Sequence, residues 1–202
     1  MRRLVPICLV LLAACVPVAD HPAGDEHAPF DARLQGAWRP TGGKDATTTL
    51  FVGADDESGR GAHLVVVEET VGRRWKVDEY TGVAVRRATH GYLSIRYATS
   101  DGSRRGWVIA RYTMLGTERL RLETLDEPRL AALVRDGTLA GTVHGDDPGA
   151  DVDLSLGSDE LLAFLESPRG SALFTSPQVL ARVPGSGSRS PTTRRTAGSH
   201  PE

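Results

Sequence analysis

Residues 91–99, GYLSIRYAT, decide the fold of this chain because they alternate strictly between two faces. Leu93, Ile95 and Tyr97 fall on one face, whereas Tyr92, Ser94 and Arg96 fall on the other. A period of two is typical of a strand with one buried face. The stretch therefore predicts a β-strand.

The segments on either side follow the same pattern. Trp107 and Ile109 share one face of the next run, and Leu120 and Leu122 alternate with charged residues after it. Residues 62–69, AHLVVVEE, form a short β-branched run. Further strand candidates are short and bounded by turn residues: 35–40, 47–53, 74–87, 138–145, 151–156 and 178–183.

Two segments break this period and predict short helices. Residues 127–135 have a proline in the first turn and leucines at helical spacing, and residues 159–167 follow Ser158 as the expected N-cap. Many short antiparallel strands must hide their edges by closing into a barrel or by packing together. We therefore expect a mainly β fold, a small antiparallel β-barrel or curved sheet with two short helices.

The ends of the chain lack any apolar period. Residues 16–29 are rich in proline, alanine and acids, and residues 184–202 contain no large apolar residue. Such segments cannot offset the entropy lost on ordering. We expect residues 15–29 to form a flexible tether, residues 30–183 a β-rich globular domain and residues 184–202 a disordered tail.

The amino terminus carries an apolar run, residues 4–12, and Leu12 is followed by Ala13, Ala14 and Cys15. As a helix this run is about 14 Å long at ~1.5 Å per residue, which is half the thickness of a bilayer core of ~30 Å. With Arg2 and Arg3 before it, the run predicts an export signal. The segment resembles a bacterial lipoprotein signal peptide that closes in its lipobox.

That resemblance implies a lipid-anchored protein. Signal peptidase II would remove residues 1–14 by cleavage after Ala14, and Cys15 would carry thioether-linked diacylglycerol and an acylated amino terminus. Residue 16 is Val16, not the aspartate that usually keeps proteobacterial lipoproteins in the inner membrane. In a Gram-negative host we expect the outer membrane, facing the periplasm. A plain secretory signal with an incidental Cys15 is the alternative.

Residues 30–38, FDARLQGAW, resemble the opening motif of lipocalins, in which a Phe-Asp turn leads to Gly-x-Trp at the first strand. The resemblance implies a lipocalin-like barrel whose floor is closed by Trp38, with Arg182 as the best candidate to stack on it. It also implies an apolar small ligand inside the barrel, next to Trp38, Leu93, Ile95, Trp107 and Ile109. An ordinary packed core made from the same residues is the alternative.

The sequence offers no catalytic motif. It has no Gly-x-Ser-x-Gly in the folded region, no phosphate-binding loop and no dinucleotide fingerprint. Carboxylates within residues 146–153 could bind calcium, but Asp147-Pro148-Gly149 is also an ordinary turn sequence. We assign no catalytic residue, no metal ligand and no cofactor.

We expect a non-enzymatic binding or envelope-interaction module. Its partners would be the membrane, through lipid on Cys15, and either an apolar ligand or an envelope protein, as in a structural or assembly role. Arginine pairs at 73–74, 86–87 and 104–105 would either gather into a patch for anionic headgroups or remain solvated charges. A formal net charge of −2 gives no general attraction to nucleic acid. An acid–base enzyme around His144 is the competing class.

Overall fold

The computed structural model describes residues 17–42, 47–55, 59–70, 74–97, 106–145 and 150–186. The expected signal peptide, Cys15 and residues 187–202 of the expected tail lie outside the described residues. In the described part, no helix has the length and apolar character needed to cross a membrane.

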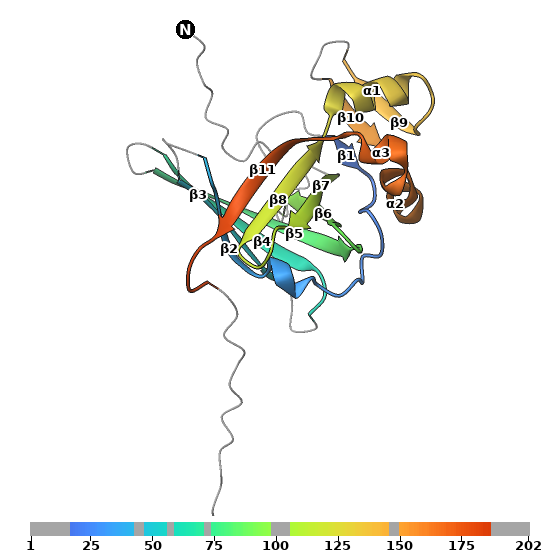
Figure 1. Ribbon diagram of the computed structural model, residues 1–202. Helices are drawn as coiled ribbons and strands as arrows, with labels where there is room; N and C mark the ends of the chain where they lie inside the picture. The colour runs from blue at the N-terminus through green and yellow to red at the C-terminus, as the bar shows by residue number, and fades with distance from the viewer. Residues whose placement is uncertain are drawn as a thin grey trace, which may run out of the picture.

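Eight antiparallel strands form a closed β-barrel (Figure 1). Strands β2 to β8 are neighbours in chain order, and β11 pairs with both β8 and β2 to close the barrel. The bounds are β2 Gly36–Pro40, β3 Thr47–Ala54, β4 Ala62–Thr70, β5 Arg74–Arg86, β6 Gly91–Tyr97, β7 Trp107–Met114, β8 Arg119–Leu125 and β11 Phe174–Arg182. The predicted fold class is confirmed, and the architecture is consistent with a small lipocalin-like barrel.

An insertion, residues 126–173, separates β8 from β11 and lies beside the barrel (Figure 1). It contains α1 Glu127–Arg135, β9 Gly141–His144, β10 Asp151–Leu154, α2 Ser158–Glu166 and α3 Pro168–Ser171. Helix α1 has the predicted bounds, and the Asp126 side chain caps it by accepting from the backbone N–H of Arg129 at 3.1 Å. Helix α2 begins one residue early, with Gly157 as its N-cap instead of Ser158. The short helix α3 was not predicted.

Residues 17–29 differ from the flexible tether expected there, because they pack against the barrel. Strand β1, Val18–Ala19, pairs antiparallel with β7 and parallel with β10. The backbone N–H of Ala23, which is fully buried, donates to the Ser94 hydroxyl at 2.9 Å. The small side chains of Ala19 and Ala23 let the segment lie close to the barrel, although they give no apolar period in the sequence.

Neighbouring strands of the barrel run in opposite directions, and its two ends are named here by the elements that lie at each. The β1 end is the end at which β5 and β7 begin and at which β1 pairs with β7. The C-terminal end is the end at which these strands finish and β11 also finishes. It carries the short 3-10 helix η2, Ala32–Leu34, which precedes β2.

Hydrophobic side chains form two cores, one on each face of the barrel wall. The inner core fills the barrel and includes Leu34, Trp38, Leu64, Tyr80, Leu93, Ile95, Tyr112 and Leu180. The outer core lies between the insertion and the outer face of β5, β6 and β7, and includes Val83, Val85, Tyr92, Trp107, Ile109, Leu130, Leu161 and Leu165. These strands therefore carry apolar residues on both faces, as strands covered on both sides do.

Candidate functional site

The floor of the barrel is closed by Trp38 and Arg182. Trp38 is fully buried, and its indole N–H donates to the carbonyl of Leu34 at 2.8 Å. The guanidinium of Arg182 lies 4.1 Å from the centre of the Trp38 ring. It also donates to the carbonyl oxygens of Arg33, at 2.9 Å, and of Thr117, at 3.0 Å. The contact predicted between Arg182 and Trp38 is therefore present.

Asp31 adds a buried polar network at the same end. Its carboxylate accepts a hydrogen bond from the Tyr112 hydroxyl at 2.8 Å and from the Arg33 Nε at 2.9 Å. Burial alone would raise the pKa of Asp31, but the hydrogen bonds from Arg33 and Tyr112 outweigh it and lower the pKa. Burial, followed by the hydrogen bond to Asp31, raises the pKa of Tyr112. The ionised carboxylate thus fastens η2 to the barrel wall.

The barrel interior above this floor is filled by side chains. Leu93 and Ile95 face inward, as predicted, and each is 4 % exposed. Tyr80, nearer the β1 end, is 1 % exposed. An eight-stranded barrel is wide enough either to be filled by side chains or to hold one small ligand. Among the described residues, surfaces this inaccessible to water border no ligand-sized void. Leu93 and Ile95 therefore belong to a packed core in this structure.

Trp107 and Ile109 do not face the interior, so this part of the predicted ligand wall is wrong. The β6–β7 register pairs Leu93 directly with Ala110. Directly paired residues share a face, and a shift of one residue moves a side chain to the other face. Trp107 and Ile109 consequently lie in the outer core, against the insertion. The alternation within each run was visible in the sequence, but the alignment between the two runs was not.

The inner face becomes polar toward the β1 end. Thr48, Glu68 and Lys76 are direct partners across β3, β4 and β5, on the face that carries the inner core. The Lys76 ammonium lies 2.7 Å from the Asp78 carboxylate. The Thr48 hydroxyl is buried and has no hydrogen-bond partner within the described part of the chain. This row suits polar groups and would bind a purely apolar molecule poorly.

The outer face at the β1 end carries an apolar patch, here called the exposed strip: Phe51, Val65, Val67, Trp75 and Val77. Trp75 is 63 % exposed, Val77 55 % and Phe51 45 %. The register pairs Val65 with Phe51 and Val67 with Val77, so the strip is continuous across β3, β4 and β5. The sequence signal for it was the run AHLVVVEE, which is apolar on both faces.

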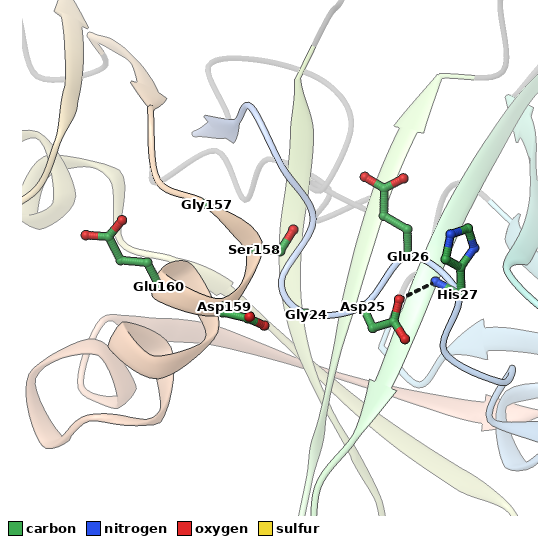
Figure 2. A pocket seen from close by; sticks show the side chains of 8 residues that line it. All are labelled: Gly24, Asp25, Glu26, His27, Gly157, Ser158, Asp159 and Glu160. Atoms are coloured by element: carbon green, nitrogen blue, oxygen red, sulfur yellow. Dashed lines mark hydrogen bonds between the residues drawn. The ribbon is translucent and has the colours of Figure 1, made fainter.

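An open pocket of about 700 Å³ lies where residues 24–27 pass the start of α2 (Figure 2). Its polar side chains are Asp25, Glu26, His27, Ser158, Asp159 and Glu160. The Asp25 carboxylate accepts from the backbone N–H of His27 at 2.8 Å, and the Glu26 and Glu160 side chains point apart (Figure 2). No three histidine, cysteine, aspartate or glutamate side chains gather into a metal site among the described residues. We read the pocket as a solvated acidic rim.

Three histidines lie apart, and each faces its own carboxylate: His63 with Glu79, His90 with Glu166 and His144 with Asp153. His90 and Tyr92 join the β5–β6 turn to the end of α2, since His90 Nε2 lies 3.1 Å from both Glu166 and the Tyr92 hydroxyl. Burial would raise the pKa of Glu166, but hydrogen bonds from Tyr92 and His90 lower it. This cluster holds the insertion on the barrel.

The remaining sequence candidates do not converge. Arg86 ends β5 and Arg87 follows it at the C-terminal end, whereas Arg74 begins β5 at the β1 end, so these two pairs form no single patch. Arg73 lies outside the described residues. Arg87 lies 4.0 Å from Glu166, across the barrel–insertion contact. Residues 104–105 and 146–149 lie outside the described residues, as do Ala14 and Cys15.

Comparisons of the chain with protein-family models, with curated proteins and with solved structures gave no match. The evidence for an interaction role therefore comes from the geometry of the barrel. It consists of a closed and filled barrel, a polar row inside one end and the exposed strip outside the same end.

Proposed function

We propose that this protein is a lipid-anchored envelope protein that acts as a non-enzymatic interaction module. Acyl chains on Cys15 would hold it at a membrane, with the outer membrane facing the periplasm as the expected site. The lipobox-like Leu12-Ala13-Ala14-Cys15 supports the anchor. The observation that carries the interaction role is the exposed strip, because contiguous apolar side chains on a rigid surface mark contact sites.

The packing favours the outer surface over the interior as the place of contact. Leu93 and Ile95 are already covered by their neighbours, whereas Trp75 and Val77 are more than half exposed. A ligand in the barrel would have to displace packed side chains, but a partner on the strip would bury surface that is now in water. Burial of apolar surface contributes roughly 25 cal/mol per Å².

A lipocalin-like carrier of an apolar molecule is the second candidate. The eight-stranded barrel and the stacking of Arg182 on Trp38 favour it. The filled interior speaks against it, and so does the polar row of Thr48, Glu68 and Lys76 at the β1 end.

A titration separates the two candidates. The purified protein is titrated with a fatty acid and with a hydrophobic dye, and binding is followed by calorimetry and by dye fluorescence. The interaction module predicts no saturable site. Saturation near one equivalent, with tryptophan emission changing in parallel, would establish the carrier instead.

A structural or assembly partner of an outer-membrane complex is a narrower form of the same proposal. A photo-crosslinking residue at Val77, in the living cell, tests it directly. Crosslinks to one envelope protein favour the assembly role, and crosslinks at the matched position Glu118, which is exposed at the C-terminal end, give the background.

A further inference from the structure

We propose that the exposed strip docks on the lipid surface that anchors the chain, with Trp75 in the interfacial layer. This inference rests on the proposed lipid anchor at Cys15 and names the partner of the strip. It assigns the barrel an orientation in which the β1 end faces the membrane.

The link between the anchor and the fold is short. Pro17 is buried, and Val18 already pairs with β7 and β10. Two residues of chain span at most about 7 Å, from Cys15 to Pro17. The β1 end is therefore held close to the residue that would carry the lipid, and the domain cannot move far from the membrane.

The strip lies at this same end of the barrel, on the outer face of β3, β4 and β5. The register connects Val18 with Val108, Val108 with Ile95, and Ile95 with Gly82 on β5. Trp75 lies further along β5, by about 23 Å at ~3.3 Å per residue. A strand tilt of about 40° leaves about 18 Å of this along the barrel axis, but the three steps of ~4.8 Å across the tilted strands from β1 to β5 run the other way by about 9 Å. The start of β5 therefore stands about 9 Å beyond Val18, which is close to the reach of the link, so the β4–β5 hairpin reaches the lipid surface when this end faces it.

The chemistry of the hairpin suits a membrane interface. Trp75 is 63 % exposed, and it follows Arg73 and Arg74 in the sequence. Tryptophan with neighbouring basic residues is enriched at the boundary between headgroups and acyl chains. Phe51 and Val77 extend the apolar surface on the same face. Glu69 and Glu79 share this face by register, at positions where the hydrated headgroups can solvate them.

A soluble protein partner fits this placement less well. The short link turns the β1 end toward the lipid, so a partner from the periplasm would have to enter between the domain and the membrane. Lipid is already present there, at a concentration that no protein partner matches.

Tryptophan fluorescence of the full lipidated protein tests the proposal. The protein is reconstituted into phosphatidylcholine vesicles with and without bromine atoms near the top of the acyl chains. Of the three tryptophans, Trp38 is fully buried and Trp107 is 6 % exposed, so the difference between the wild type and Trp75→Phe isolates Trp75. We expect brominated lipid to reduce this Trp75 signal by about half, and acrylamide quenching to fall relative to detergent solution.

The matched control places a tryptophan at the other end of the barrel. Leu115 is 37 % exposed and follows β7 at the C-terminal end. In the Trp75→Phe background, Leu115→Trp should remain accessible to acrylamide and unaffected by bromine. Circular dichroism checks that both variants keep the β-fold.

Flotation of the same vesicles keeps the two proposals apart. Protein that floats with Trp75 unquenched by bromine retains the anchor and overturns the docking, whether or not acrylamide reaches Trp75. If acrylamide also fails to reach this unquenched Trp75, the strip contacts protein instead of lipid. Protein that does not float overturns the anchor itself. Flotation with selective quenching of Trp75 supports both.

Discussion

The guanidinium of Arg182 lies 4.1 Å from the centre of the Trp38 ring, and the two residues are direct partners across β11 and β2. These are the last and first strands of the barrel in chain order. A contact between a residue near the start of the domain and one near its end thus closes the barrel at its C-terminal end. Gly36 permits it, because a side chain there would collide with the Arg182 guanidinium.

Arg182→Ala should destabilise the protein by about 2 kcal/mol. It removes a stacking contact of about 0.5–2 kcal/mol together with the hydrogen bonds to the carbonyl groups of Arg33 and Thr117. The stability of Arg182→Lys should fall between that of the wild type and that of Arg182→Ala, because an ammonium keeps the charge but lacks the planar guanidinium group. Urea denaturation gives the three free energies of unfolding. An alanine variant within about 0.5 kcal/mol of the wild type would show that the contact does not close the barrel.

Asp31 should make stability depend on acid pH. Its folded pKa lies below its ordinary value, so the unfolded chain binds the proton more readily. The contribution is therefore complete above the unfolded pKa of about 3.9 and is lost as pH falls through the folded pKa. Thermal unfolding between about pH 6 and pH 3 should show a steeper loss for the wild type than for Asp31→Asn. Equal slopes for both proteins would contradict this role.

Ser94→Ala should loosen the segment before the barrel. The Ser94 hydroxyl is fully buried and accepts from the backbone N–H of Ala23, so its loss leaves a buried donor unpaired at a cost of about 1–3 kcal/mol. Hydrogen exchange should show faster exchange at Ala23. Ser155→Ala, at an exposed position of the insertion, serves as the control. Unchanged protection at Ala23 would mean that this bond does not hold the segment.

Gly91→Ala should destabilise the inner core by about 1–3 kcal/mol. A Cβ at Gly91 would lie 2.3 Å from the Tyr112 ring, whose hydroxyl also holds Asp31. Gly53→Ala, on β3, is the matched control, because a Cβ there meets nothing within 4 Å. Chemical denaturation of both variants checks the contrast. A Gly91→Ala variant as stable as Gly53→Ala would show that the ring moves aside freely.

The sequence predicted those features that depend on neighbours along the chain. The period of two in residues 91–99 and the proline at the start of residues 127–135 reflect local rules, and both elements were found. The stacking of Arg182 on Trp38 was reached through a resemblance to lipocalins, and the contact is present.

The remaining features depend on how separate segments meet. The face of Trp107 and Ile109 is set by the register of β6 against β7, which neither strand encodes alone. The sequence of residues 17–29 gave no sign of packing, because the side chains that pack against the barrel there are small ones such as Ala19 and Ala23. The exposed strip was hidden for the opposite reason: Trp75 and Val77 resemble core residues until the strands around them are placed.

Mass spectrometry of the native protein, purified from its own membranes, tests the anchor most directly. We expect the amino-terminal peptide to begin at Cys15 and to carry a diacylglyceryl group on sulfur together with an amide-linked acyl chain. A free thiol at Cys15, or a chain that still contains residues 1–14, would contradict the account and remove the basis for membrane docking.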